Sequence, residues 1–418
     1  MFEELFGLDP AYDQLDRQIM QQTHSAMADI DLIGQYNQLK VLKAFIKNKV
    51  SSYHLGISTG YGYGDDGRDT LGQVFADCFG AEDALCRLQI MSGTHALTIA
   101  LFGLLRSGDQ MYCVTGRPYD TLCDVIGLGE NRYGSLREFG IGYEESPLDL
   151  SDEGLRVIEN KARKARVVYL QRSRGYSARP SLSIDDIKNI AQAAKKANPD
   201  CVILVDNCYG EFTCRQEPLE VGADLIAGSL IKNPGGAVAE TGGYIAGSHD
   251  LVELCAHRMS APGPGREIGC SLQGLRNLYL GLYLAPSITA EAMKSSVYAS
   301  ALFESLGYKV SPAYDGPRSD IVTSVNMRDE EEITLFCRAI QSSSPVDSHL
   351  TPQAWDMPGY SDPVIMSSGA FTGGSSIELS CDAPMRPPFT VYLQGGISLA
   401  SSRYALLRAA QQLKKDAV

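Results

Sequence analysis

The chain has 418 residues and a formal net charge of −13, with 44% hydrophobic and 21% charged residues. This composition is typical of an ordinary globular protein and excludes the disordered and fibrous classes. Because the chain is acidic and has no Lys/Arg-rich run, we expect no nucleic-acid partner. The length exceeds what one small core needs and favours a large domain plus a smaller one.

The cysteines and the N-terminal residues indicate the cellular compartment of the protein. The 11 cysteines are scattered and odd in number, and MFEELFGLDP is acidic where a signal peptide would be basic and then apolar. The longest apolar stretches, such as residues 96–105, are far shorter than the ~20 residues of a membrane-spanning helix. We therefore expect a cytoplasmic protein without a membrane partner. Dispersed histidines and the lack of a CxxC motif predict no metal site.

Helical periodicity dominates the first part of the chain. Residues 11–50 have few helix breakers, so residues 1–60 are expected to form a helical segment that packs on the dimer. From about residue 70 to 255, helical stretches alternate with short apolar runs, namely LCRLQIM, QMYCVT, ARVVYLQ, CVILVDN, ADLIAGS and GGYIAGS. This alternation predicts a mostly parallel sheet between two layers of helices, and we assign it to residues 61–270.

A different texture follows the breaker-rich residues 261–265. A helical segment from about 272 to 306 leads into strands near IVTSVNM, VIMSS and SSIELS and a last helix at about 399–415. Residues 271–418 therefore predict a linker helix and a small C-terminal α+β domain.

Two short patterns match familiar signatures without the context that their chemistry requires. Gly62, Gly64 and Gly67 spell GxGxxG, but polar residues precede them and two aspartates would lie where a pyrophosphate must bind. Ser229 and Lys232 spell SxxK, but the Asn-Pro-Gly-Gly that follows prevents the helix that such a serine site needs. Neither site is expected.

A helix start after the first apolar run is a candidate anion site. Ser92, Gly93 and Thr94 lie between LCRLQIM and the helical segment HALTIALFGLL. Free backbone N–H groups, small side chains and the helix dipole together favour a phosphate there. The alternative is that Ser92 only caps the helix.

Two charged residues follow predicted strands at the edge where α/β proteins bind ligands. Asp206 ends CVILVDN, and Lys232 follows ADLIAGSLI. A buried aspartate there needs a cationic partner such as a pyridinium, although a cap or salt bridge is the commoner role of a lone Asp. Burial beside Leu230, Ile231 and Pro234 would lower the pKa of Lys232 and make it a nucleophile, although a loop lysine is more often solvated.

Two further residues complete the groups that pyridoxal phosphate (PLP) chemistry needs. Ser229 offers a hydroxyl to the phosphate. Tyr119 follows the run QMYCVT and is placed to stack on a ring, with a core tyrosine as the alternative. A lysine, an aspartate, a phosphate cup and an aromatic ring in this order predict a PLP enzyme.

Seven segments carry a family resemblance: TGYGYGDDGRDTL (59–71), SGTHAL (92–97), RPYDTL (117–122), QRSRGYS (171–177), VDNCYGEF (205–212), GSLIKNPGG (228–236) and GSSIELSCDAPMRPPFTVYLQGG (374–396). Through them nearly the whole chain resembles the cystathionine β-lyase-like family associated with aluminium resistance, also described as methionine γ-lyase family proteins. The resemblance implies the aspartate-aminotransferase-like fold of fold-type-I PLP enzymes. That fold has a three-layer α/β/α large domain and a smaller C-terminal α+β domain.

The resemblance also implies roles for individual residues. Lys232 would bind PLP as a Schiff base, Asp206 would face the pyridine nitrogen and Tyr119 would stack on the ring. The phosphate would be held by Ser92, Gly93, Thr94 and Ser229. In related lyases a Tyr-and-Arg loop reaches the phosphate of the neighbouring subunit, and here that loop looks like Tyr61 or Tyr63 with Arg68. A homodimer or homotetramer with its active site at the subunit interface is therefore implied.

The arginine for the substrate carboxylate is sought in the tail, which departs from the better-known lyases. Arg386 is the first choice and Arg403 the reserve, because a guanidinium binds a carboxylate through two parallel hydrogen bonds. The stretch QRSRGYS replaces a motif of the lyases that contains proline and asparagine. Arg172, Arg174 and Tyr176 are all open as the contact to the phenolic oxygen of the cofactor.

The implied activity is carbon–sulfur cleavage of a sulfur-containing amino acid, by elimination of a thiol from the β or γ carbon. Lys232 would act as the acid and base, with Tyr119 or the neighbouring subunit's Tyr61 or Tyr63 assisting the leaving group. The alternatives are another PLP reaction on the same fold, such as transamination or aldol cleavage, and a binding protein without turnover.

Overall fold

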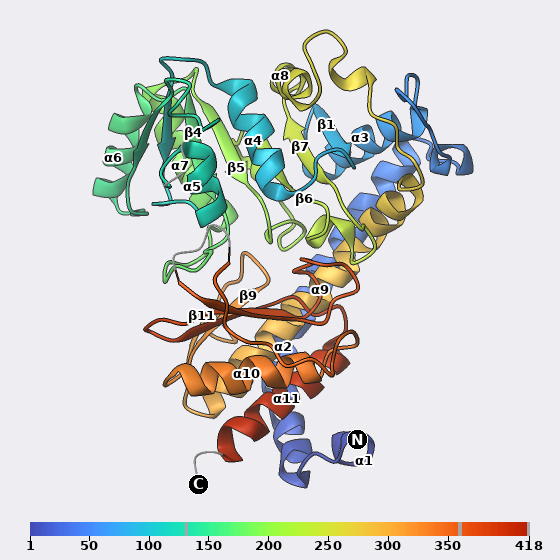
Figure 1. The fold of residues 1–418 in the computed structure, drawn as a ribbon, viewed down its shortest axis with the longest axis vertical. Helices are drawn as coiled ribbons and strands as arrows, with labels where there is room; N and C mark the ends of the chain where they lie inside the picture. Colours follow the sequence, from blue (N-terminus) through green and yellow to red (C-terminus); the bar gives the residue numbers. More distant parts are fainter. Residues whose placement is uncertain (130–132, 358–361, 416–418) are drawn as a thin grey trace.

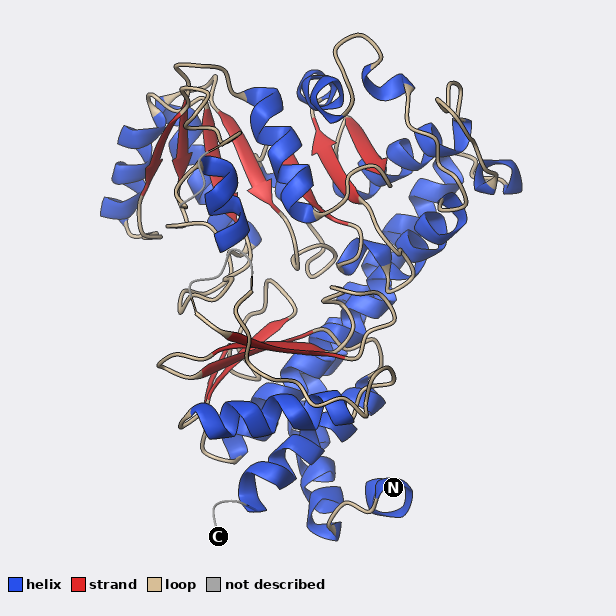
Figure 2. Ribbon diagram, in the orientation of Figure 1, coloured by secondary structure: helices blue, strands red, loops and turns tan. Residues whose placement is uncertain are grey.

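Two sheets and a pair of long helices organise the computed structural model, which describes residues 1–129, 133–357 and 362–415. Helix α2 (Pro10–Lys47) and helix α9 (Leu275–Ser305) lie side by side and run past both sheets (Figure 1). The larger sheet lies toward one end of these helices and the smaller sheet toward the other (Figure 2). This arrangement leaves an edge of the larger sheet facing the smaller one.

In the described part of the chain the large sheet has seven strands in the spatial order β1-β7-β6-β5-β4-β2-β3. Strand β7 is antiparallel to both of its neighbours, and the strands from β6 to β3 are parallel. The strands are β1 Asp83–Arg87, β2 Gln110–Cys113, β3 Gly142–Glu145, β4 Val167–Gln171, β5 Val202–Asp206, β6 Leu225–Ser229 and β7 Gly243–Gly247.

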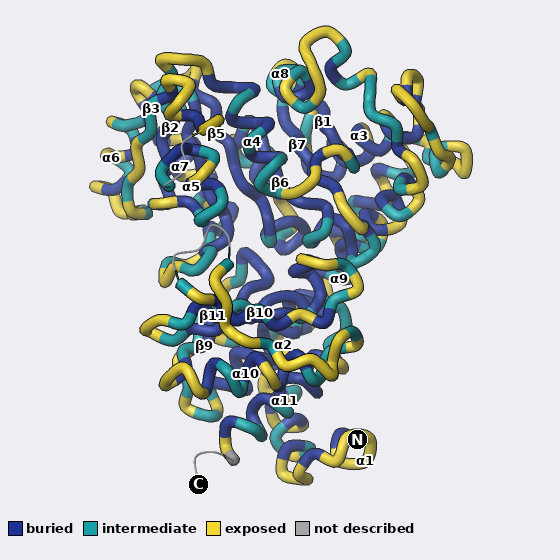
Figure 3. Tube along the Cα trace, in the orientation of Figure 1, coloured by how far each residue is buried: buried dark blue, intermediate teal, exposed yellow. Residues whose placement is uncertain are grey.

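The central strands are buried along their whole length because helices cover both faces of the sheet (Figure 3). Continuous apolar runs such as VILV in β5 are typical of such strands, and the predicted mostly parallel sheet is confirmed. Strand β1 begins and ends earlier than the predicted run LCRLQIM, since it stops at Arg87. Strand β3 lies at the sheet edge, is only partly buried and was not predicted.

Two layers of helices enclose this sheet. Apolar residues of α4, α5 and α8 form a core on one face, and those of α3, α6 and α7 form a core on the other. The helices are α3 Asp66–Phe79, α4 Gly93–Leu104, α5 Asp120–Ile126, α6 Asp152–Ala162, α7 Ile184–Ala197 and α8 His249–Met259. The predicted three-layer architecture is thus confirmed.

The small sheet is antiparallel, with the spatial order β10-β11-β12-β9-β8, and packs on α10 (Glu330–Ser342), α11 (Leu399–Lys415) and α9. Its strands are β8 Lys309–Ser311, β9 Val322–Asn326, β10 Val364–Ser368, β11 Ser380–Pro384 and β12 Thr390–Gln394. The predicted strand SSIELS was wrong in position, because β11 starts only at Ser380. Strands β8 and β12 were not predicted.

A close helix contact fixes the N-terminal segment on the rest of the chain. At Gly34 of α2 a Cβ atom would lie 2.9 Å from the Cβ of Ala290 in α9, so only glycine allows this approach. The short helix α1 (Phe2–Phe6) precedes α2. Domain boundaries at residues 60 and 270 stay predictions. No helix of the described residues is long and apolar enough to cross a membrane.

Candidate functional site

A cavity of about 770 Å³ lies at the carboxyl ends of the parallel strands, between the two sheets. Asp206 ends β5 and Ser229 ends β6, and both side chains line it. This is the position where α/β folds bind ligands, since loops after the parallel strands leave an opening there. The cavity brings together seven of the residues that the sequence singled out, namely Ser92, Gly93, Thr94, Tyr119, Asp206, Ser229 and Lys232.

One end of the cavity is formed by the start of α4. Ser92 caps this helix by accepting a hydrogen bond from the backbone N–H of His95 at 3.1 Å. A Cβ atom at Gly93 would lie 3.3 Å from the Sγ of Cys208 and 3.5 Å from the Cβ of Ser229. The N–H groups at the start of α4 and the hydroxyls of Ser92 and Ser229 therefore lie in a tight space, which suits a phosphate group.

The carboxylate of Asp206 is almost completely buried at the floor of the cavity. It accepts hydrogen bonds from the backbone N–H of Cys208 at 3.1 Å and from the hydroxyl of Tyr169 at 3.4 Å. Burial raises the pKa of Asp206, while the Cys208 N–H and the charge of Lys232 oppose that rise. A carboxylate in this position needs a cationic group beside it.

The amino group of Lys232 lies in the same cavity and is held by residues of both parts of the chain. Its Nζ donates to the hydroxyl of Ser376 at 3.0 Å and lies 3.8 Å from the centroid of the Tyr209 ring. Burial lowers the pKa of Lys232, but Tyr209, Cys208 and Asp206 outweigh burial and raise it above the usual value. The expected lowering of this pKa was therefore wrong, because the sequence did not reveal these neighbours.

Tyr119 lies at the start of α5 with its ring in the cavity. Its hydroxyl is 3.2 Å from the Oγ1 of Thr94, and its backbone N–H donates to Gln171 at 3.1 Å. Burial, together with the negative charge of Asp206, raises the pKa of Tyr119 well above its usual value. The phenol therefore keeps its proton at neutral pH and is available as a hydrogen-bond donor.

The small sheet supplies the opposite wall of the cavity. Ser311, Ser324, Tyr392 and Asp382 follow one another across strands β8, β9, β12 and β11 in paired register. Tyr392 and Asp382 line the cavity, and burial raises the pKa of Asp382. This wall was not predicted, because β8 and β12 were not expected as strands and the register of the sheet cannot be read from apolar runs.

The arginines near the cavity differ in their partners. Arg174 lines the cavity and donates to the hydroxyls of Ser324 at 2.9 Å and Ser311 at 3.1 Å, while its buried Nε has no hydrogen-bond partner among the described residues. Arg386 also lines the cavity, but it forms an ion pair with Asp362 and is about half exposed.

Of the remaining predicted residues, Arg403 and Arg172 lie outside the cavity lining and Tyr176 belongs to it. Arg403 does not line the cavity and instead forms an ion pair with Asp16 of α2. Arg172 is buried, does not line the cavity and donates to Asn207 at 2.7 Å. Tyr176, like Arg174, lines the cavity.

The loop with Tyr61, Tyr63 and Arg68 lies outside the cavity of its own chain. The two tyrosine rings are 74% and 66% exposed, so they are free to contact another molecule. Arg68 is buried and donates to the carbonyl oxygens of Gly62 at 2.9 Å and Gly269 at 3.1 Å and to the carboxylate of Asp69. These bonds join the loop to the segment that contains Gly269, and a contact of Arg68 with the phosphate of a neighbouring subunit stays a prediction.

Two residues that contact Lys232, Tyr209 and Ser376, were not predicted from the sequence. Tyr209 has a positive φ of 72°, which turns its ring over the lysine, and Ser376 donates to the hydroxyl of Tyr209 at 3.2 Å. Both lie in segments that carried the family resemblance, but no local pattern distinguishes them from neighbouring residues.

Comparisons with known proteins agree with this geometry. A Listeria monocytogenes protein provisionally named a cystathionine β-lyase involved in aluminium resistance is 46% identical, with a TM-score of 0.93, and the match covers 96% of this chain and 99% of that one. A carbon–sulfur lyase involved in aluminium resistance from Clostridium novyi is 44% identical, with a TM-score of 0.93, over 99% of this chain and 98% of that one.

The fold extends to more distant proteins. The pyridoxal-5'-phosphate dependent protein YhfS from Escherichia coli is 18% identical, with a TM-score of 0.63, over 92% of this chain and 97% of that one, which shows the fold alone. The predicted fold-type-I architecture and the predicted family are both confirmed. The model of the methionine gamma-lyase family matches residues 12–414, and the chain therefore belongs to this family.

Proposed function

We propose that the protein is a PLP-dependent carbon–sulfur lyase that acts on a sulfur-containing amino acid. The observation that carries this proposal is that Lys232, Asp206 and the start of α4 line one cavity. A PLP enzyme needs a lysine to bind the aldehyde, a carboxylate to face the pyridine nitrogen and an anion site to hold the phosphate. The carbon–sulfur specificity rests on the family and on the names of its solved members.

The residues present fit the cofactor. The buried carboxylate of Asp206 accepts hydrogen bonds but has no cation in direct contact among the described residues, so a protonated pyridine nitrogen would balance its charge. Ser92, Gly93, Thr94 and Ser229 would hold the phosphate, and Tyr119 would pack against the ring. Bound PLP supplies an electron sink for the α-carbon of the amino acid.

The side chains of this chain would then handle the protons. Lys232 would take the α-proton and return it, because it lines the same cavity as Asp206 and Tyr119. Tyr119 holds its own proton and can donate it to a departing thiolate. Asp382 and Tyr392 of the small-sheet wall line the cavity and would face the substrate side chain.

Arg174 and Arg386 are the candidates for the substrate carboxylate. Among the described residues, the buried guanidinium of Arg174 donates hydrogen bonds only to neutral hydroxyls, so it would gain most from an anionic partner. Arg386 would first have to leave Asp362. We therefore favour Arg174 over Arg386, and we assign Arg403 to structure because it is paired with Asp16.

A second copy of this chain is the partner that we propose. The exposed rings of Tyr61 and Tyr63 and the exposed apolar residues on the outer face of α2, Leu32, Tyr36, Leu39 and Ile46, support an interface between copies. The two tyrosines would then reach the cavity of the neighbouring subunit. The proposed location is the cytoplasm, where the scattered cysteines stay reduced. Analytical ultracentrifugation tests the assembly.

The first experiment is the visible absorbance of the purified protein before and after borohydride reduction, followed by peptide mapping. A yellow chromophore trapped on Lys232 supports the cofactor assignment. Lys232→Ala is expected to prevent trapping and to leave the fold intact. A colourless protein that PLP cannot reconstitute would contradict the proposal.

Turnover is tested with L-methionine and L-cystathionine. Release of a thiol, ammonia and a 2-oxo acid without an added oxo-acid acceptor supports elimination, whereas a requirement for the acceptor would indicate transamination. Asp206→Asn is expected to reduce this turnover by roughly 100-fold or more while PLP remains bound, with the exposed Asp185→Asn as the control. Unchanged turnover in Asp206→Asn would remove this residue from the site.

A further inference from the structure

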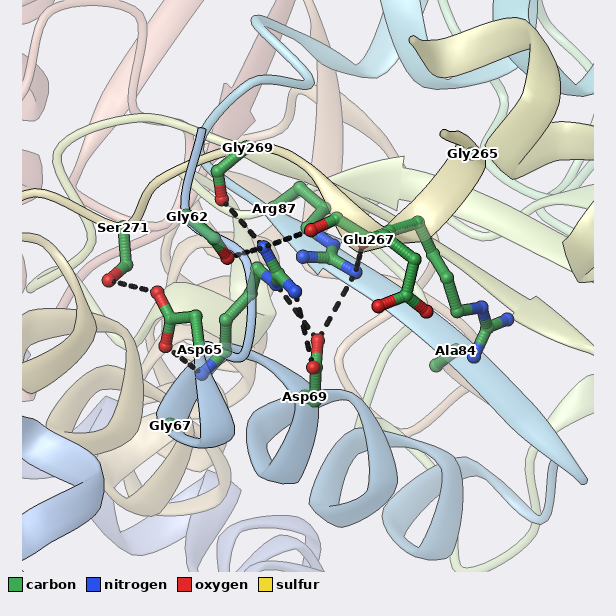
Figure 4. Close-up of polar contacts among 12 residues, drawn as sticks. Gly62, Asp65, Gly67, Asp69, Ala84, Arg87, Gly265, Glu267, Gly269 and Ser271 are labelled. Atoms are coloured by element: carbon green, nitrogen blue, oxygen red, sulfur yellow. Dashed lines mark hydrogen bonds and ion pairs between the residues drawn. The ribbon is translucent and has the colours of Figure 1, made fainter. Parts of the chain in front are cut away.

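A second cavity, of about 330 Å³, lies outside the site described above. Its walls come from the end of α2, the first turns of α3, strand β1 and the short helix η4 (Gly265–Glu267). The residues around it are shown in part in Figure 4. It is lined by Asn48, Arg68, Asp69, Thr70, Gln73, Asp83, Ala84, Arg87 and Arg266, and none of these also lines the larger cavity.

The two carboxylates of this cavity are already engaged by other residues. Asp83 accepts two hydrogen bonds from Arg266, at 2.6 and 3.1 Å, and a further contact from His249 at 2.8 Å. Asp69 accepts two hydrogen bonds from Arg68, at 2.8 and 3.1 Å. Each of the two aspartates therefore accepts two hydrogen bonds from a single guanidinium group.

Arg87 is the guanidinium that is left without a carboxylate of its own. It is only 4% exposed, and its Nη1 has no hydrogen-bond partner among the residues that the structure describes. Its Nη2 donates to the carbonyl oxygen of Arg266 at 3.1 Å and lies 3.6 Å from Asp69, which Arg68 already holds (Figure 4). A buried charge with an unused donor is unfavourable unless an anion joins it.

We propose that this cavity is a binding site for a small oxyanion, held by Arg87 through a carboxylate or phosphate group. The guanidinium offers a planar pair of donors that matches either group. Three arginines and two aspartates line the cavity, and Arg266 also forms an ion pair with Glu253, so Arg87 is the arginine whose guanidinium keeps an unused donor among the described residues. Apart from Ala84 the lining is polar, so an apolar ligand has nothing to pack against.

The site is separate from the cofactor cavity, so its occupancy is measured on the intact PLP-loaded protein. The phosphate-binding end of the larger cavity is then filled, and a response to inorganic phosphate reports on other sites. Titration calorimetry and thermal unfolding are carried out with phosphate and, separately, with acetate at matched ionic strength. We expect the Tm to rise with the concentration of at least one of these ions.

Arg87→Met is the decisive variant because it keeps the volume and removes the charge. Its affinity for the ion is expected to fall at least tenfold, while its Tm in ion-free buffer stays equal to or above that of the native protein, since a buried charge with an unused donor is removed. Arg87→Lys, which keeps the charge without the paired donors, should bind more weakly than the native protein. Arg163→Met, at an exposed position after α6, is the control and should behave as the native protein does.

Three results would overturn the proposal. The first is a native protein that responds to neither ion, and the second is an Arg87→Met variant that responds as the native protein does. The third is an Arg87→Met variant that loses PLP absorbance or dissociates into smaller assemblies, because a group of a neighbouring subunit would then occupy the cavity. If Arg87→Met does not fold, the same comparison is made with Arg87→Lys, and an unchanged affinity there would equally reject the site.

Discussion

The amino group of Lys232 lies 3.8 Å from the centre of the Tyr209 ring, and the hydroxyl of Ser376 is hydrogen-bonded to both side chains. Tyr209 comes from the loop after β5, whereas Ser376 comes from the segment that precedes β11. An ammonium over a ring face is stabilised as a cation, and the nearby Asp206 adds to this effect. The lysine is therefore held protonated where the two parts of the chain meet.

This environment predicts how the attachment of PLP depends on pH. The neighbours raise the pKa of Lys232, so the neutral amine that reacts with an aldehyde becomes more abundant as the pH rises. Below that pKa the neutral fraction increases about tenfold for each pH unit. The rate of reconstitution of PLP-free protein, followed by absorbance, should therefore increase between pH 6 and 9. A rate that does not change over this range would contradict the raised pKa.

The two cavity arginines should differ in their effect on substrate binding. Arg174→Ala removes a buried guanidinium and should weaken the binding of L-alanine by roughly 30-fold or more. Arg386→Ala should weaken it about fivefold or less, because that side chain is half exposed and paired with Asp362. Binding is followed by the visible spectrum of the PLP-loaded protein, which also shows that PLP is retained.

L-alaninamide separates carboxylate recognition from other effects of these changes. It lacks the negative charge, so the native protein should bind it less well than L-alanine, and Arg174→Ala should remove this preference. L-alanine carries no sulfur, so the measurement stands even if the reaction is not carbon–sulfur cleavage. If Arg386→Ala removes the preference and Arg174→Ala keeps it, the roles of the two residues are reversed.

Arg403 should matter for stability and not for catalysis. Asp16, its partner, is buried and also accepts a hydrogen bond from Tyr298 at 2.9 Å. Arg403→Ala leaves this carboxylate without its cation, which is expected to cost about 3 kcal/mol of unfolding free energy. Arg408→Ala is a matched control on the same helix, since its guanidinium donates to the hydroxyl of Tyr404. Urea unfolding measures the difference, and a raised KM in Arg403→Ala would return this residue to the substrate site.

The sequence predicted the cofactor end of the site far better than the opposite wall. Asp206 and Lys232 each follow an apolar run long enough to define a buried strand, and the ends of parallel strands meet at one edge. The contact of Arg174 with Ser324 joins residues 150 positions apart. That contact depends on how the small sheet packs against the large one, and no local period encodes this packing. Strand β11 was misplaced for a related reason, because SCDAP has neither an apolar run nor a clear alternation.

A buried glutamate in the segment after β5 predicts a pH dependence of stability. Glu211 accepts a hydrogen bond from the hydroxyl of Tyr244 at 2.6 Å, and its other oxygen has no hydrogen-bond partner among the described residues. Burial raises the pKa of Glu211 to about 8. Between its usual pKa and this value, the unfolded chain releases the proton while the folded chain keeps it. The unfolding free energy therefore falls as the pH rises through this range.

Glu211→Gln removes this ionisation and keeps the acceptor for Tyr244. Relative to the native protein, the variant should gain stability between pH 5 and pH 8, by an amount on the order of a few kcal/mol. Thermal and urea unfolding at both pH values measure the gain, with Glu153→Gln at an exposed position of α6 as the control. A difference between variant and native protein that is the same at both pH values would show that Glu211 is ionised in the folded chain. Its charge would then have to be balanced by the nearby Arg172, which also contributes to the electrostatics of this carboxyl group.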